Sequence, residues 1–376
     1  MAFLNGIRIL DLSRLLPGPY STMLLADLGA EVIKIESPIV GDYVRTISPD
    51  FGGEAIFAAV NRGKKSVALN YRNPRGRELF LRLAQKVDVV IETFRPGAVR
   101  RWKIDYDAVR AVNPRVVYCS LSGYGQSGPY VNRAGHDLNY IAISGLLALH
   151  GAAGGPPLPP GVPMADLAGG MLVALAVLAA LVGRGHSGQG AYLDVSMLDA
   201  AVSWMAPMTG QLAGLGQNPR GRMPLTGKLA CYNVYETADG KFVSLAALEP
   251  HLWTAFCAAV ERDDLSNRQF DPDATAQVAA ILSQRTRDEW QERFRAVDAC
   301  VEPVNTLDEM LLDPQVRHRG LVQETGQFAS PFRFAPQNDA SPAPTLGRHT
   351  RQVLEQAGIG DKEIQELLAA RVIKVT

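Results

Sequence analysis

The sequence predicts an α/β protein with a large, doubly wound (Rossmann-like) domain and a smaller α+β domain. Strand-like runs of β-branched residues alternate with helical segments through residues 1–122, as in a parallel sheet with helical crossovers. The chain has 376 residues and is 47% hydrophobic, whereas a single core stops growing at about 250–300 residues. From Ala230 the pattern changes to a hairpin and short polar helices, which indicates a second domain.

The first repeat of this pattern lies at the N-terminus. Residues 6–12 are expected to form a strand, residues 13–19 a turn, and residues 20–28 a helix that ends at Gly29. Residues 31–36 are expected to form the next strand. The whole stretch has the length of a βαβ unit. It lacks a GxGxxG motif and therefore predicts no dinucleotide site.

Three more strands are expected at residues 67–71, 87–92 and 116–122. A helix at residues 74–86 separates the first two, and another helix ends at residues 109–113. Ligands of doubly wound sheets bind at the carboxyl ends of the strands. The loops at residues 93–97 and 123–129 are therefore candidate ligand-binding loops.

The next region contains a helix at residues 141–149, a Gly/Pro-rich connection at 152–163 and a long apolar helix at 167–182. Its most apolar run has about 15 residues, fewer than the ~20 that span a bilayer, so we expect a buried core helix. Asp166 precedes this helix, where the helix dipole is expected to lower its pKa and keep it ionised. An alternative is that Asp166 is only a helix N-cap.

The remaining elements define the expected domains. A strand at 190–196 and a helix at 197–206 complete the large domain, and residues 218–229 resemble a mobile loop. A hairpin at 232–247, helices at 273–283 and 286–296, and a strand at 299–304 form the small domain. We expect a large domain at 1–205, a linker at 206–224, a small domain at 225–325, and a segment at 326–376 that returns to the large domain.

Composition excludes several classes of function. Lys plus Arg and Asp plus Glu both total 38, so bulk charge gives no support for nucleic-acid binding. The four cysteines are widely spaced and no His-x-x-His pair occurs, so no metal site is expected. The N-terminus lacks a signal-peptide pattern, and we expect a cytoplasmic protein without a membrane partner.

Several segments resemble the family III CoA transferase (CaiB/BaiF) superfamily over nearly the whole chain. The segments that carry the resemblance are Gly-Ile-Arg-Ile-Leu-Asp-Leu-Ser at 6–13, Pro-Gly-Pro at 17–19, and residues 25–36, 61–66, 94–97 and 123–129. The resemblance implies two interlocked subunits in a homodimer and a large domain that binds coenzyme A. It assigns CoA binding to a set of residues near the strand ends: Arg62, Lys64, Lys65, Arg95, Gly125 and Tyr140.

Within the superfamily, the chain is most similar to the α-methylacyl-CoA racemases of lipid metabolism. It shares Gly-His-Asp-x-Asn-Tyr at 135–140, Asp166 before Gly169-Gly170, Glu249-Pro250, and the pattern at 298–304. The transferases use the aspartate corresponding to Asp166 as a nucleophile and carry a glycine-rich loop that this chain lacks. The segment at 226–231 departs from the racemase pattern, so the acyl specificity of known racemases does not transfer.

The resemblance implies a racemase that acts on 2-methyl-branched acyl-CoA thioesters by removing and returning the α-proton through an enolate. His136 and Asp166 are the expected acid/base pair, with Glu249 orienting His136. Backbone N–H groups at the start of the helix after Asp166 are candidate donors to the enolate oxygen. No separate cofactor is expected, because coenzyme A is part of the substrate. The alternatives are a CoA transferase with Asp166 as nucleophile, and a CoA-binding scaffold without catalysis.

Overall fold

The computed structural model describes residues 2–47, 50, 52–217, 219–323, 327–334 and 341–376. The chain forms two compact units. The large unit comprises Met1–Leu146, Pro160–Met205 and Gly320–Thr376, and the small unit comprises Leu147–Pro159 and Ala206–Arg319. The expected boundary at residues 325 and 326 falls on a position outside the described residues.

The large unit is built on a seven-stranded sheet with the order β10-β3-β2-β1-β4-β5-β6. All neighbours pair in parallel except β10, which is antiparallel to β3. The strands are β1 (Arg8–Asp11), β2 (Glu31–Glu36), β3 (Lys65–Leu69), β4 (Val89–Glu92), β5 (Val117–Ser122), β6 (Ala191–Ser196) and β10 (Ile373–Lys374). This confirms the predicted doubly wound sheet.

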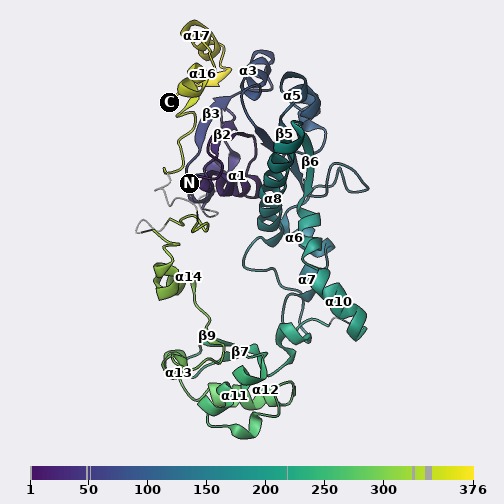
Figure 1. Ribbon diagram of the computed structural model, residues 1–376, viewed down its shortest axis with the longest axis vertical. Helices are drawn as coiled ribbons and strands as arrows, with labels where there is room; N and C mark the ends of the chain where they lie inside the picture. The colour runs from purple at the N-terminus through teal and green to yellow at the C-terminus, as the bar shows by residue number, and fades with distance from the viewer. Residues whose placement is uncertain (1, 48–49, 51, 218, 324–326, 335–340) are drawn as a thin grey trace. The chain divides into compact units, whose positions relative to one another are not determined.

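The crossovers of the large unit are helical (Figure 1). The helices are α1 (Pro17–Asp27), α2 (Gly53–Asn61), α3 (Pro74–Ala84), α4 (Ala98–Trp102), α5 (Tyr106–Val112), α6 (Asp137–Ile143), α8 (Met164–Ser187), α9 (Met197–Ser203), α16 (Thr350–Gln356) and α17 (Asp361–Ala369), with a 3₁₀ turn η1 (Tyr43–Thr46). The expected helix at 141–149 is instead two helices, α6 and α7 (Leu146–Leu149), because Gly145 between them has a φ of 86°.

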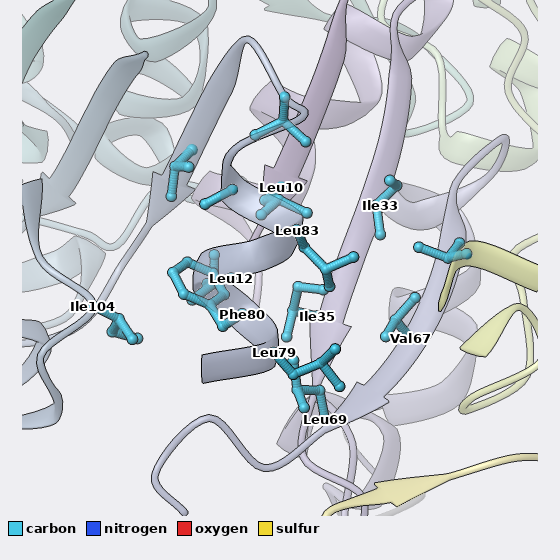
Figure 2. Packing of buried hydrophobic residues seen from close by; sticks show 14 of the residues in the cluster. Leu10, Leu12, Ile33, Ile35, Val67, Leu69, Leu79, Phe80, Leu83 and Ile104 are labelled. Carbon is cyan, nitrogen blue, oxygen red and sulfur yellow. The ribbon is translucent and has the colours of Figure 1, made fainter. Parts of the chain in front are cut away.

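One face of the sheet is apolar. Leu10 of β1 and Leu12 just after it lie beside Ile33 and Ile35 of β2, and the alternation of extended backbone turns all four side chains to the same side. Figure 2 shows this layer against Leu79, Phe80 and Leu83 of α3. The C-terminal helices α16 and α17 contribute side chains to the same core. The C-terminal part of the chain therefore packs against the sheet that the N-terminal part forms.

The opposite face of the same strands carries buried charges. The Lys34 ammonium lies 3.1 Å from the Asp42 carboxylate, and the Lys64 ammonium lies 3.2 Å from Asp11. All four side chains are fully buried. Thr22 of α1 donates a hydrogen bond of 2.6 Å to Asp11, so α1 covers this face while α3 covers the other.

Helix α8 is 24 residues long and begins three residues before the position expected from the sequence. Its length and hydropathy are sufficient for a membrane span, but core helices of soluble proteins meet the same criterion, and part of the helix is buried in the large unit. Gly169 and Gly170 allow close packing. A Cβ at Gly170 would lie 2.6 Å from the Pro17 carbonyl, and one at Gly169 would lie 2.8 Å from Met197 Cγ.

The small unit contains an antiparallel sheet with the order β7-β8-β9. Its strands are β7 (Tyr232–Glu236), β8 (Phe242–Ala246) and β9 (Val301–Pro303), and Asp239-Gly240 forms the predicted hairpin turn. Its helices are α10 (Ala206–Leu215), α11 (Pro250–Ala259), α12 (Ala274–Leu282), α13 (Arg287–Phe294), α14 (Leu307–Leu312) and α15 (Pro314–His318), with short turns η3 (Pro224–Lys228) and η4 (Asp263–Leu265). Trp253 and Phe256 of α11 are fully buried in its core.

Candidate active site

A cavity of about 350 Å³ opens at the carboxyl ends of β1, β4 and β5. Strands β1 and β4 are adjacent in the sheet although the chain leaves β1 toward β2, so the strand order reverses between them. This topological switch point is where doubly wound sheets bind ligands. Five of the expected site residues line this cavity: Arg95, Gly125, His136, Tyr140 and Asp166.

The turn after β1 forms one wall of the cavity and is held by three hydrogen bonds. Lys34 Nζ donates to the Ser13 carbonyl at 2.8 Å. The Arg14 backbone N–H donates to Thr93 Oγ1 at 3.1 Å, and the Leu15 N–H donates to Asp42 Oδ1 at 3.2 Å. Leu15 has a φ of 64°, a left-handed conformation that costs a bulky residue about 1–2 kcal/mol. The hydrogen bonds around it hold the turn in this strained shape.

The motif at residues 135–140 places His136 at the edge of the cavity. His136 is the N-cap of α6, and its backbone N–H donates to Asn139 Oδ1 at 3.0 Å. Tyr140 OH donates to the Gly135 carbonyl at 2.5 Å. A Cβ at Gly123 or Gly135 would clash with the Tyr140 ring, so both glycines make room for it. The motif therefore fixes the backbone on both sides of an exposed imidazole.

Asp137 connects this motif to Asp166. Its Oδ1 atom accepts hydrogen bonds from Ala165 N at 2.6 Å and Asp166 N at 3.1 Å, which caps the first turn of α8. The Leu167 N–H is also occupied, by the Pro163 carbonyl at 3.1 Å. The expectation that N–H groups at the start of this helix serve an enolate oxygen is therefore corrected. These three donors already have protein acceptors.

The expectation that the helix dipole lowers the pKa of Asp166 is wrong. Burial, and to a smaller extent the neighbouring Asp137 carboxylate, together raise this pKa to about 7. Asp166 lies within the first turn of α8, while Pro163 is the N-cap, so the N-cap alternative does not hold either. A carboxyl group that titrates near neutrality can both accept and donate a proton under ordinary conditions.

The cavity also contains three guanidinium groups, from Arg14, Arg95 and Arg133. Among the described residues, none of the three forms an ion pair with a carboxylate. Arg133 lies 3.9 Å from the Tyr130 ring centre. Sequence reasoning missed Arg14 and Arg133. The position of Arg14 directly after a strand of the sheet was the signal available for finding it.

The other basic residues expected to bind CoA lie elsewhere. Arg62 is buried against Asp27, and Lys64 Nζ donates to the Pro19 carbonyl at 2.8 Å, to Thr22 at 2.7 Å and to Asn61 at 2.8 Å. Lys65 pairs with Glu31. Arg62 and Lys64 have almost no exposed surface, so their burial and pairing argue against contact with a phosphate. In this structure, arginines at the strand ends supply the cavity with its positive charge.

Glu249 belongs to the small unit, where it is the exposed N-cap of α11. The buried Gln269 side chain donates to the carbonyls of Ala247 at 2.9 Å and Leu248 at 2.8 Å, which fixes the segment that leads to Glu249. The contact between Glu249 and His136 stays a prediction.

Comparison with known proteins finds the same family over nearly the whole chain. The family model described as CoA-transferase family III matches residues 4–350. The human succinyl-CoA:glutarate CoA-transferase is 34% identical, with 98% of this chain and 90% of the relative covered. The human alpha-methylacyl-CoA racemase is also 34% identical, with 99% of this chain and 97% of the relative covered. The crystal structure of a CaiB/BaiF family protein from Brucella suis is 30% identical and superposes with a TM-score of 0.81, covering 94% of this chain and 99% of that chain.

Proposed function

The chain belongs to CoA-transferase family III, and we propose that it is a racemase that inverts the α-carbon of 2-methyl-branched acyl-CoA thioesters. Members of the family are enzymes named both as racemases and as CoA transferases, and this chain is equally identical to one of each. The observation that carries the proposal is that His136 and Asp166 line one cavity, with the pKa of Asp166 raised to about 7.

Inversion requires two groups that take and return a proton on opposite faces of one carbon. One group accepts the α-proton while the C–H electron pair moves into the enolate, and the other group donates a proton to the opposite face. Imidazole suits this role because it titrates near neutrality. Asp166 suits it because burial brings its carboxyl group into the same range.

Coenzyme A is proposed to lie along the carboxyl edge of the sheet. A second cavity of about 430 Å³ lies at the ends of β1, β2 and β3, and Arg14 and Tyr43 line both cavities. A long thioester fits such a pair of cavities with its reactive end beside Asp166. Arg95 and Arg133 are proposed to bind its phosphates, because guanidinium groups form strong hydrogen bonds to phosphate oxygens.

A CoA transferase is the alternative function, because this chain is as identical to the human succinyl-CoA:glutarate CoA-transferase as it is to the human racemase. In that reaction the Asp166 carboxylate attacks the thioester carbonyl, CoA leaves as the thiolate, and a mixed anhydride forms on Asp166. Such an enzyme needs a second carboxylic acid and has no need of His136 as a base.

The deciding experiment incubates the enzyme with a 2-methylacyl-CoA in D₂O, without any acceptor acid. The proposed racemase incorporates deuterium at the α-carbon, and His136→Ala and Asp166→Ala each reduce this exchange by at least about 100-fold, as expected for loss of a general acid/base. No exchange by the wild type, combined with hydroxylamine trapping at Asp166 and CoA transfer to an added acid, would show the transferase instead. Full exchange by His136→Ala would exclude the two-base mechanism.

A further inference from the structure

We propose that Arg14 is a substrate-binding residue that holds an anionic oxygen group, a phosphate or a carboxylate, at the junction of the two cavities. The inference rests on the proposed binding of a CoA thioester and adds a residue to it. Arg14 and Tyr43 are the two residues that line both cavities. A thioester that extends from one cavity into the other must therefore pass the Arg14 side chain.

The Arg14 guanidinium is held between two aromatic rings. Its Cζ atom lies 4.6 Å from the centre of the Phe94 ring and 5.3 Å from that of Tyr43. Such contacts hold a guanidinium plane in place while its edge stays free to donate hydrogen bonds. The backbone beneath is equally constrained, because the strained Leu15 and the hydrogen bond to Thr93 fix the turn.

The donors on Arg14 are not used up by the protein. Its Nε atom is buried and has no hydrogen-bond partner. Within the part of the chain that the structure describes, no carboxylate forms an ion pair with Arg14. A buried N–H donor without an acceptor costs free energy. A polar ligand that supplies the acceptor removes this cost and therefore binds more tightly.

The nearby carboxyl group does not supply that acceptor. Glu92 is buried at the end of β4 and accepts a hydrogen bond of 2.7 Å from Phe94 N. Burial raises its pKa to about 7, so its negative charge is incomplete at neutral pH. The carboxylates of Glu36 and Asp42, which also line the second cavity, pair with Arg45 and Lys34. Arg14 therefore has no ion-pair partner among the described residues, as expected for a group that binds an anion.

Two parts of the substrate carry anionic oxygens: the CoA phosphates and an acyl group with a second carboxylate. Calorimetric measurement of the binding of stable thioether analogues shows which of the two groups Arg14 binds. S-ethyl-CoA carries phosphates alone, S-carboxymethyl-CoA carries both groups, and S-carboxymethyl-pantetheine carries the carboxylate alone. The test compares wild type, Arg14→Gln, Arg14→Lys and the matched control Arg75→Gln, whose residue is half-exposed on α3 and lines neither cavity.

Loss of a charged hydrogen bond is expected to weaken binding roughly 10- to 100-fold. If Arg14 binds phosphate, Arg14→Gln weakens both CoA ligands equally and leaves the pantetheine ligand unchanged. If Arg14 binds an acyl carboxylate, the loss appears only with the two carboxymethyl ligands. Arg14→Lys should recover part of the loss in either case, and Arg75→Gln should bind like wild type.

Equal affinities of wild type and both Arg14 variants for all three ligands would overturn the proposal. Failure of the wild type to bind any CoA ligand would instead overturn the proposed function. Should Arg14→Gln unfold, as seen by loss of its thermal transition, the comparison of Arg14→Lys with wild type decides. The proposal then fails if Arg14→Lys binds every ligand with wild-type affinity.

Discussion

Three features of its surroundings act on the ionisation of Asp166. The helix N-terminus favours the ionised form, whereas burial and the neighbouring carboxylate oppose it. Burial is the larger effect, and it raises the pKa to about 7. The dipole acts only over the first turn and is worth about 0.3–1 kcal/mol, whereas desolvation of a buried carboxylate shifts its pKa by up to several units. Asp137 contributes twice, because it caps α8 and adds negative charge beside Asp166.

The substitution Asp137→Asn is expected to lower the pKa of Asp166. The asparagine oxygen still accepts from Ala165 N, but the charge that opposes ionisation of Asp166 is gone. For the enantiomer from which Asp166 removes the proton, exchange falls below about pH 7 in the wild type, because only the ionised carboxylate is a base. At pH 5, the rate expressed as a fraction of each enzyme's maximal rate should therefore be about three- to tenfold higher in the variant than in the wild type.

The measurement is the pH dependence of kcat/KM for α-deuterium exchange, with both enantiomers. For the enantiomer from which Asp166 removes the proton, the acidic limb of the profile should move to lower pH. For the other enantiomer, to which protonated Asp166 gives a proton, the basic limb should move to lower pH. Asp107→Asn on the surface of α5 is the control and should leave both limbs in place. Unchanged limbs in Asp137→Asn would show that Asp137 does not set the pKa of Asp166.

Lys64 is expected to contribute to stability more than to CoA binding. Burial alone would raise the pKa of Asp11, yet Lys34, Lys64 and two hydroxyl hydrogen bonds hold it at about 2. Lys64→Met removes one of these ammonium groups and leaves Asp11 buried with less compensation. Breaking a buried ion pair in this way costs about 3–5 kcal/mol.

Denaturant unfolding measures this loss, and Lys65→Gln is the matched neighbour. Lys65 is partly exposed and pairs with Glu31 at the surface, so its substitution should cost less than about 1 kcal/mol. Neither variant should change the affinity for CoA more than about twofold while folded, a difference of about 0.4 kcal/mol. A stable Lys64→Met protein with a CoA affinity reduced tenfold would restore the phosphate-binding role that the family resemblance implied.

The turn after β1 depends on a glycine in α1. A Cβ at Gly18 would lie 2.2 Å from Ser13 Cβ and 2.7 Å from Thr93 Cγ2, which leaves no room without moving the turn that carries Arg14. We expect Gly18→Ala to destabilise the protein by about 1–3 kcal/mol, as overpacking does, and to weaken CoA binding. Gly183→Ala is the control. Gly183 is an exposed position near the end of α8 with no atom within 4 Å of a new Cβ, and its substitution should stabilise the protein by about 0.5–1 kcal/mol.

Thermal unfolding of both alanine variants tests this contrast. A Gly18→Ala protein as stable as the wild type, with unchanged CoA affinity, would show that the turn tolerates displacement. Both changes convert glycine to alanine within a helix, so helix propensity opposes neither of them. Any difference between them therefore reports the packing at Ser13 and Thr93.

The elements that the sequence predicts well are those with a local signal. Strands β1, β2, β4 and β5 are β-branched runs between turns, and the His136–Asp166 pair follows recognisable motifs. The two-residue strand β10 was missed because it exists only through pairing with β3, about 300 residues away in the chain. The raised pKa of Asp166 and the free edge of Arg14 depend on burial and on strained backbone, which no local pattern encodes.

One side of α8 in the large unit is both apolar and exposed. Met171, Leu175 and Val182 are 55%, 63% and 64% exposed and recur at helical spacing, while Val173 and Val177 on the other side of the helix are buried. Trp204, just after α9, is 49% exposed in the same unit. An apolar surface of this kind is typical of a subunit interface, and we propose that a second copy of the chain covers it in a homodimer.

The substitution Leu175→Glu is expected to weaken this dimer. Its carboxylate would be desolvated in an interface between apolar side chains, which costs several kcal/mol, whereas in a monomer it would be exposed to water and nearly neutral in effect. Light scattering after gel filtration should find the wild type at twice the 40.6 kDa chain mass and the variant shifted toward the monomer on dilution. The control Glu366→Gln, at an exposed site on α17, should leave the mass unchanged.

The family resemblance implies interlocked subunits that fold together, so we expect the variant also to lose thermal stability as its concentration falls. A wild type that is monomeric at micromolar concentration would refute the homodimer. A fully dimeric variant would place the interface away from this side of α8.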